Sequence, residues 1–275
     1  MMEINKIYNE DCAATLHRME NHSIDIVLTS PPYNTGRPTT SDRGRENHEG
    51  RYDVHMDTVP TQEFIEWIIH LFNQFDRVLK PNGCVLWNMS YASDETVNTD
   101  GNDLLWLVVA DIIRKTNFTV VDNITWKKNS ALPNNVSKNK LTRICEPVFV
   151  FTRKSERATF TANKKVSSVG KNGQTFYTPV ENFIQARNND ENCPLNKATY
   201  SSDLCEQLLN IYAKPGSVVY DPFMGSGTTG VACKRLGHSY IGSEISPNQV
   251  KWAEERISGE KVLDNGEVIS KESLF

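Results

Sequence analysis

The chain has 275 residues, of which 38% are hydrophobic, and a mean hydropathy of -0.49. This length suits one large α/β domain or one domain with a small insert, and the sequence has no run of about 18 apolar residues, the length that a membrane-spanning helix requires. The net charge is -4 and the six cysteines are scattered without a C-x-x-C pair, so we expect a reduced, cytoplasmic protein with no membrane segment and no metal site.

Strands and helices alternate from the start of the chain. A short strand from Asn5 to Tyr8 leads to Asp11, which suits the N-cap of a helix from Cys12 to Met19. A second strand, from Ser23 to Ser30, has the Ile-Val-Leu composition of a strand buried on both faces. Because ligands of open α/β sheets bind beyond the carboxyl ends of the strands, Asp11 is either a simple cap or part of a ligand site.

The motif Thr29-Ser30-Pro31-Pro32-Tyr33 follows this second strand. Two prolines remove two backbone donors and end the strand, so nearby carbonyls stay available to other groups. The Ser30 hydroxyl and the Pro31 carbonyl can accept the two hydrogens of a planar amine, which would localise the lone pair of its nitrogen, while Tyr33 offers a ring for stacking. The pattern predicts an active-site loop; the alternative is a loop in which proline only ends a strand.

The alternation continues to Thr152. The polar segment from Asn34 to Thr58 has no regular period and is predicted to form a lid or a substrate-contacting loop. Five further elements are expected: helices at 61–79 and 103–115 and strands at 84–89, 118–126 and 146–152, with a turn at 81–83. This order predicts a doubly wound α/β sheet.

Basic residues concentrate between Lys127 and Lys171. Eleven lysines and arginines occur there against only two acids, Glu146 and Glu156, and several asparagines lie among them. Such a mixture suits phosphates and base edges, although charge runs also form ordinary solvated faces. The candidate contacts to nucleic acid, in this segment and after the first motif, are Asn34, Arg37, Lys127, Lys128, Lys138, Lys140, Arg143, Lys164 and Lys165.

The segment from Lys154 to Pro194 breaks the alternation. It has short β-like pieces at 158–162 and 175–177 and no long helix, so it is predicted to be an insert outside the sheet. The alternation then resumes with a helix at 201–212, a strand at 217–220, a helix at 228–236 and a strand at 239–243.

A glycine-rich motif, Asp221-Pro222-Phe223-Met224-Gly225-Ser226-Gly227-Thr228-Thr229-Gly230, joins the last strand–helix pair. Its G-x-G-x-x-G spacing lets the backbone approach a ligand, and Glu244 at the end of the next strand can bond both hydroxyls of a ribose. A carboxylate at Asp221 would repel a pyrophosphate and attract an ammonium. The motif therefore favours S-adenosylmethionine over a nicotinamide dinucleotide.

Together, the two motifs resemble the catalytic and cofactor motifs of the β-class amino-group DNA methyltransferases. The resemblance covers most of the chain, from Asn9 to about Arg256. It implies a circularly permuted, mostly parallel sheet of the S-adenosylmethionine-dependent methyltransferase type, with a catalytic domain at 1–153 and 195–257, a target-recognition insert at 154–194 and a C-terminal tail at 258–275. The implied catalytic residues are Ser30, Pro31, Pro32 and Tyr33. The implied cofactor residues are Asp221, Phe223, Gly225, Ser226, Gly227, Thr228 and Thr229, with Glu244 at the ribose and Asp11 and Cys12 at the adenine.

The resemblance implies methyl transfer to the exocyclic amine of a base flipped out of double-stranded DNA, with no covalent enzyme intermediate. Ser30 in the catalytic motif points to cytosine N4; adenine N6 is the alternative because Asn34 after Tyr33 is frequent among adenine enzymes. Methylation of carbon 5 is disfavoured because none of the six cysteines follows a proline. An RNA or protein amine methyltransferase, a non-catalytic DNA-binding module, a homodimer and a cognate restriction endonuclease as partner stay open, as does the recognised DNA sequence.

Overall fold

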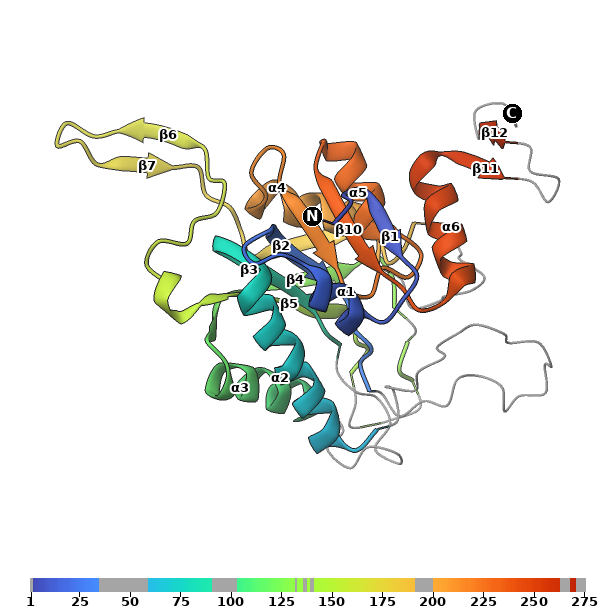
Figure 1. Ribbon diagram of the computed structural model, residues 1–275. Coiled ribbons are helices and arrows are strands. Elements are labelled where there is room, and N and C mark those ends of the chain that lie inside the picture. Colours follow the sequence, from blue (N-terminus) through green and yellow to red (C-terminus); the bar gives the residue numbers. More distant parts are fainter. Residues whose placement is uncertain are drawn as a thin grey trace.

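The computed structural model describes residues 2–34, 59–90, 103–131, 133–135, 138, 141–190, 200–262 and 268–270. Its centre is an eight-stranded sheet with the strand order β1-β10-β9-β2-β3-β5-β4-β8 (Figure 1). The first five of these strands run parallel: β1 (Lys6–Tyr8), β10 (Ser239–Ser243), β9 (Val218–Asp221), β2 (Ile24–Thr29) and β3 (Leu79–Asn88). β5 (Cys145–Arg153) is antiparallel to both β3 and β4 (Phe118–Lys128), and β8 (Phe183–Ala186) is parallel to β4.

Helices cover both faces of the sheet, which confirms the predicted doubly wound α/β fold. On one face lie α1 (Cys12–Arg18), α2 (Thr61–Val78) and α3 (Leu104–Lys115). On the other lie α4 (Ser202–Tyr212), α5 (Thr228–Leu236) and α6 (Pro247–Ser258). The strand β2 sends Val27 into the first core and Ile26 and Leu28 into the second, so its continuous apolar run follows from burial on both faces.

The ends of the parallel strands define two opposite sides of the sheet, which are distinct from its outermost strands β1 and β8. We call the side where the parallel strands end the carboxyl edge; Thr29, Asn88 and Asp221 lie there. We call the side where they begin the amino edge. The strands β9 and β10, which come late in the chain, lie between β1 and β2, which come first. The predicted circular permutation and the exact domain limits stay predictions.

Three expectations need correction. The predicted turn at 81–83 lies inside β3, where a register shift opposite Ile24 and Ile26 accommodates it and Asn82 takes a positive φ of 59°. The predicted strand at 158–162 is absent, since these described residues form a turn and an irregular segment. The insert is not wholly outside the sheet, because β8 joins it and buries Ile184 and Ala186 on one face.

The remaining described elements are small. A 3-10 helix (Lys154–Glu156) follows β5, and β6 (Val166–Val169) and β7 (Thr175–Tyr177) form an antiparallel hairpin that extends from the body like an arm (Figure 1). β11 (Glu260–Val262) pairs with β12 (Val268–Ser270) near the C-terminus. Among the described helices, none combines the length and the apolar composition needed to cross a bilayer.

Candidate active site

The catalytic motif lies at the carboxyl edge, directly after β2, and is tied to the neighbouring strand β3. Ser30 Oγ lies 2.7 Å from Tyr33 Oη, and Tyr33 donates a hydrogen bond of 2.8 Å to Asn88 Oδ1. Asn88 in turn donates from Nδ2 to the Pro147 carbonyl of β5, at 3.1 Å. The sequence analysis missed Asn88, although a polar residue at the carboxyl end of a buried strand is a usable signal.

Asn34, predicted to contact DNA, has a different role in the structure. It adopts a positive φ of 52° and is only 1% exposed. Its Nδ2 donates to the Val59 carbonyl at 2.9 Å and its Oδ1 accepts from the Val59 N–H at 3.1 Å, which holds the end of the catalytic motif beside the start of α2. The side chain therefore has almost no exposed surface for a DNA contact. Arg37 and the predicted lid up to Thr58 lie outside the described residues.

Asp221 is the most densely bonded carboxylate of the site. Its Oδ1 accepts from Thr29 Oγ1 at 2.6 Å and from the Phe223 N–H at 3.0 Å. Its Oδ2 accepts from Thr229 Oγ1 at 2.6 Å and from Tyr200 Oη at 3.2 Å. Tyr200 Oη also lies 2.6 Å from Thr229 Oγ1, so these two hydroxyls share two hydrogens among three contacts and Oδ2 need not receive both. Asp221 is only 1% exposed, which leaves its carboxylate almost no surface for the predicted direct contact with an ammonium group.

Burial raises the pKa of Asp221, and its hydrogen bonds from Thr229 and Thr29 oppose that shift. Asp221 is 1% exposed, so its hydrogen bonds replace the water that the carboxylate loses on folding. Its bond to Thr29 is the direct link between the strand that carries the catalytic motif and the glycine-rich motif. From the sequence, Thr29 was noted as the first residue of the catalytic motif but given no role, and nothing distinguished Tyr200 from other polar residues.

The glycine-rich motif forms the turn between β9 and α5. Gly225 and Gly227 have positive φ angles of 51° and 82°. A Cβ atom on Gly227 would lie 2.8 Å from the Ala253 Cβ of α6, so this position requires glycine for its backbone angle and for helix packing. The N–H of Gly225 points to Glu244 and donates to Oε2 at 2.8 Å.

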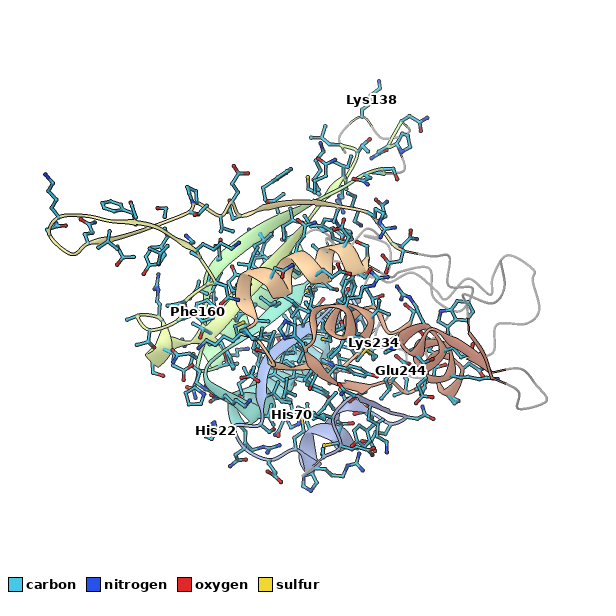
Figure 2. All side chains as sticks on the ribbon, turned by 90° about the horizontal axis from the view of Figure 1, so that it is seen from above. His22, His70, Lys138, Phe160, Lys234 and Glu244 are labelled. Carbon is cyan, nitrogen blue, oxygen red and sulfur yellow. The ribbon has the colours of Figure 1, made fainter. Side chains whose placement is uncertain are left out.

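Glu244 lies at the end of β10, beside this turn (Figure 2). Besides the bond from Gly225, its Oε1 accepts from the Ser246 N–H at 2.9 Å. Burial raises the pKa of Glu244, and the hydrogen bonds from Ser246 and Gly225 oppose the shift. Since each carboxylate oxygen can accept two hydrogen bonds, the geometry leaves acceptor capacity on Glu244 for a ligand.

The predicted adenine-side residues lie at the carboxyl end of β1. Asp11 Oδ1 accepts from the Ala13 N–H at 2.7 Å, so Asp11 is the N-cap of α1 as expected. Cys12 is buried, and burial raises the pKa of its thiol to about 12, which keeps it protonated. Asn9 donates to the Glu244 carbonyl at 2.9 Å and thereby holds the ends of β1 and β10 together.

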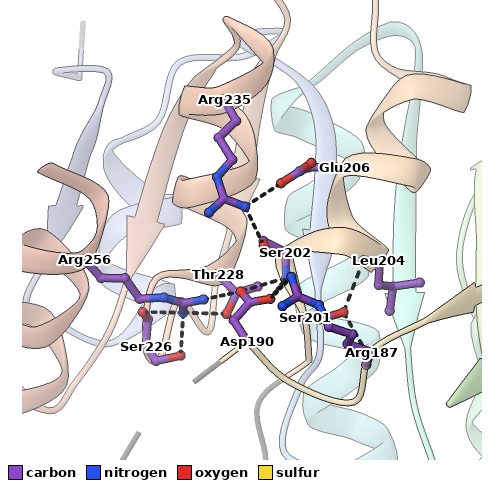
Figure 3. A network of polar contacts seen from close by, with 10 residues as sticks. All are labelled: Arg187, Asp190, Ser201, Ser202, Leu204, Glu206, Ser226, Thr228, Arg235 and Arg256. Carbon is purple, nitrogen blue, oxygen red and sulfur yellow. Dashed lines mark hydrogen bonds and ion pairs between the residues drawn. The ribbon is translucent and has the colours of Figure 1, made fainter. Parts of the chain in front are cut away.

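An arginine from α6 clamps the glycine-rich turn (Figure 3). Arg256 Nη1 donates to the Ser226 carbonyl at 3.1 Å and to Thr228 Oγ1 at 2.9 Å. Its Nη2 pairs with Asp190, whose two oxygens also accept from the Ser202 N–H at 3.0 Å and 2.9 Å at the start of α4. The side chains of Arg256 and Asp190 are each 11% exposed. Neither residue was predicted to belong to the site.

The candidate DNA-contacting lysines fall at both edges of the sheet. Lys127, Lys128, Lys138 and Arg143 belong to the end of β4 and the connection to β5, at the carboxyl edge. Lys128 is engaged with Glu146 and lies 4.8 Å from the centroid of the Trp126 ring. Lys140 lies outside the described residues.

Lys164 and Lys165 lie at the amino edge instead. The preceding residue, Asn163, donates its N–H to the Ile211 carbonyl at 2.6 Å, at the end of α4 that precedes β9. Nearby Phe160 stacks on Tyr212 of the same helix end, and Figure 2 shows it well apart from Lys138. This position does not fit the prediction that Lys164 and Lys165 contact the same DNA as the catalytic motif.

No metal-binding arrangement of three or more His, Cys, Asp or Glu side chains occurs in the described part of the chain. The described site offers hydrogen-bond acceptors, the Tyr33 ring and the glycine-rich turn. These features come together where β2 and β9 lie side by side in the sheet.

Comparisons with known proteins agree with this arrangement. A family model described as DNA methylase matches residues 24–255. Among curated proteins, the type II methyltransferase M.BglII of Bacillus subtilis is 27% identical, over 95% of this chain and 71% of its own length. The type II methyltransferase M.Cfr9I of Citrobacter freundii is also 27% identical, over 92% of this chain and 88% of its own.

Solved structures share the fold. The cytosine-N4-specific PvuII DNA methyltransferase superposes with a TM-score of 0.71 at 20% identity and covers 99% of this chain and 90% of its own. A Thermus thermophilus protein, TTHA0409, described as a putative DNA modification methylase in complex with S-adenosyl-L-methionine, gives a TM-score of 0.59 at 19% identity, over 92% of this chain and 93% of its own. The predicted methyltransferase type of sheet is thereby confirmed.

Proposed function

This chain belongs to the DNA methylase family, and from that premise we propose that it transfers a methyl group from S-adenosylmethionine to the exocyclic amine of a base in double-stranded DNA. The favoured target is cytosine N4 and the alternative is adenine N6. The single observation that carries the proposal is the 2.6 Å hydrogen bond between Thr29 and Asp221. It joins the catalytic motif to the glycine-rich turn, so that an amine at Ser30 and a cofactor at the turn would share one site.

The residues at the turn fit S-adenosylmethionine. The positive φ angles of Gly225 and Gly227 shape a tight turn that a ligand can approach closely, and Glu244 keeps acceptor capacity for ribose hydroxyls. When bound, this cofactor supplies an electrophilic methyl group on a sulfonium. Asp221, at 1% exposed, would shape the turn through its buried hydrogen bonds rather than bind the ammonium of the cofactor directly.

The catalytic motif would make the amine a better nucleophile. Ser30 Oγ and the Pro31 carbonyl would accept its two hydrogens, while the base stacks on Tyr33. The nitrogen would form a bond to the methyl carbon as the sulfur–carbon bond breaks and its electron pair stays on sulfur, and the methylated nitrogen would then release one proton to solvent water. Such a transfer needs positioning and oriented acceptors rather than a covalent enzyme intermediate. A base can reach this site only when it is rotated out of the duplex, which costs a few kcal/mol.

The choice of cytosine N4 rests on Ser30, because this position resembles the cytosine-N4 members of the family. Adenine N6 stays the alternative because both amines donate two hydrogens in one plane, and the same two acceptors suit either. A homodimer and a cognate restriction endonuclease stay parts of the proposal that rest on the resemblance alone, and the cytoplasmic location rests on the scattered cysteines.

DNA would lie along the carboxyl edge. Lys127 and Lys138 are at this edge with the catalytic motif. For target recognition we propose the connection between β4 and β5 and the end of the insert after β8, where Arg187 and Asp190 also reach this edge. The hairpin of β6 and β7 starts at the amino edge, so its contribution would be to DNA outside the target site or to another partner.

The deciding experiment is mass spectrometry of nucleosides from unmethylated DNA of varied sequence after incubation with the protein and S-adenosylmethionine. N4-methylcytosine is the expected product, and Ser30→Ala, with the amine acceptor removed, is the matched control that should lose it. N6-methyladenine would keep the mechanism and change the base. If DNA carried no methylated base while RNA or protein became methylated in parallel reactions, the proposal that DNA is the substrate would be wrong.

A further inference from the structure

The hydrogen bonds that start at Ser30 form a chain whose direction can be assigned. At its far end is the Pro147 carbonyl, which can only accept, 3.1 Å from Asn88 Nδ2. The amide of Asn88 must therefore place its NH₂ group toward Pro147 and its Oδ1 toward Tyr33. A flipped amide would set two acceptor oxygens against each other.

The remaining donors follow from this assignment. Since Asn88 Oδ1 only accepts, Tyr33 gives its single hydroxyl hydrogen to Asn88, at 2.8 Å. Ser30 Oγ lies 2.7 Å from Tyr33 Oη, so the hydrogen between them must come from Ser30. The Ser30 oxygen then has only lone pairs to offer to any other group.

We propose that Asn88 is a positioning residue that acts through Tyr33 to keep Ser30 Oγ an acceptor for the target amine. This inference rests on the proposed function, because it deepens the role of Ser30 in that site. Without Asn88, Tyr33 could turn its hydrogen toward Ser30, and Ser30 could turn its own hydrogen toward the N–H groups of the amine. The acceptor would then be present only part of the time.

The burial of Asn88 protects its hydrogen bonds to Tyr33 and Pro147 from competition by water. Asn88 is 3% exposed, and it sits opposite Val148 in the antiparallel pair of β3 and β5. Water therefore competes little with its two hydrogen bonds, and the backbone of β5 holds its orientation. An amide cannot take up a proton near neutral pH, so the chain orients Ser30 and does not remove the proton that the amine loses.

The test compares Asn88→Leu with Asn88→Asp in the full-length protein, using DNA and S-adenosylmethionine at saturation. Asn88→Leu removes the acceptor for Tyr33 and should lower the rate of methyl transfer roughly 10- to 100-fold, the scale of one oriented hydrogen bond. Burial against the Pro147 carbonyl favours the protonated form of Asn88→Asp, which donates its O–H to Pro147, keeps an acceptor for Tyr33 and should recover most of that loss. Affinity for S-adenosylmethionine should stay unchanged in both variants.

Thr152→Val is the matched control for lost stability. Thr152 is also fully buried and its Oγ1 donates to the Gly83 carbonyl at 3.2 Å, between the same two strands but toward the amino edge. Its removal should leave the transfer rate unchanged. If Thr152→Val and Asn88→Leu lowered the rate equally, Asn88 would only stabilise the fold, and the inference would be wrong.

A double-mutant cycle tests whether Asn88 acts through Tyr33. Tyr33→Phe keeps the ring but breaks the chain, so Asn88→Leu should add no further loss in its presence. Losses that multiply would overturn the inference. A wild-type protein that methylates no DNA would instead overturn the proposed function, whereas an active wild type with an equally active Asn88→Leu would overturn only the role of Asn88.

Discussion

The ring and the hydroxyl of Tyr33 have separate roles. Its ring is the stacking surface proposed for the flipped base, and its hydroxyl links Ser30 to Asn88. Both of these hydroxyl bonds are made to residues of the catalytic motif and β3, and neither is made to the glycine-rich turn. A change at Tyr33 should therefore affect the base more than the cofactor.

The variant Tyr33→Ala should lower turnover by at least ~100-fold, because stacking alone is worth about 1–3 kcal/mol per base and the bond to Ser30 is lost as well. Affinity for S-adenosylmethionine should change little. Rates of methyl transfer and calorimetric binding of the cofactor, measured on the same preparation, check this prediction. A large loss of cofactor binding would show that the tyrosine lies closer to the cofactor than we propose.

Glu244 sets a pH dependence of stability. Burial raises its pKa above the ordinary value of 4.5, so the folded protein holds this proton more tightly than the unfolded chain does. Its contribution to the free energy of unfolding is therefore greatest at low pH. It should fall as the pH rises from about 4.5 to the raised folded pKa, and it should be constant above that.

The comparison with Glu244→Gln isolates this contribution, because glutamine does not titrate. The difference in unfolding free energy, wild type minus variant, should decrease as the pH rises above about 4.5 and level off above the raised folded pKa, in denaturant titrations without cofactor. Other titrating groups are common to both proteins and cancel. A difference that increases with pH would mean that the hydrogen bonds from Gly225 and Ser246 outweigh the cost of burial.

At the scale of elements, α6 stabilises the glycine-rich turn through Arg256. This side chain donates to Ser226 and Thr228 and pairs with Asp190, which caps the start of α4. The clamp connects the turn with the stretch after β8, at the end of the proposed recognition insert. We therefore expect Arg256 to position the glycine-rich turn without contacting the cofactor itself.

Arg256→Met keeps the length of the side chain and removes its charged bonds. It should weaken S-adenosylmethionine binding roughly 10-fold, since hydrogen bonds to charged groups are worth about 1.5–3 kcal/mol. Arg235→Met is the matched control: Arg235 lies on α5, is 57% exposed and bonds Ser202 and Glu206 rather than the turn. Equal binding by Arg256→Met and Arg235→Met would show that the clamp does not position the turn.

The elements that sequence predicted well are those with strong patterns. The strand β2 and the helix α5 follow from a continuous apolar run and from a glycine-rich turn, and both were placed within a residue of their observed limits. The strand β8 was missed because it has four residues, of which only Ile184 and Ala186 are buried. Pairs such as Arg256 and Asp190, or Asn88 and Tyr33, come from distant segments, and only the folded sheet brings them together.

For DNA binding, the position of the charges on the molecule matters more than its net charge. The chain carries -4 overall, yet lysines lie beside the catalytic motif at the carboxyl edge and others lie at the amino edge. Sequence order placed Lys164 and Lys165 in the same basic segment as Lys127 and Lys138. The antiparallel course of β5 separates them, because this strand carries the chain from the carboxyl edge to the amino edge.

This separation allows a comparison of two double variants with equal charge change. Lys127→Ala with Lys138→Ala should weaken DNA binding and reduce the slope of log affinity against log salt by about 2, near 0.9 for each lost phosphate contact. Lys164→Ala with Lys165→Ala should leave affinity and slope unchanged for a short duplex centred on the target base. Fluorescence anisotropy over a salt series measures both quantities. If the Lys164 and Lys165 pair reduced the slope as much as the other pair, the duplex would have to reach the amino edge, and the proposed DNA path along the carboxyl edge would be wrong.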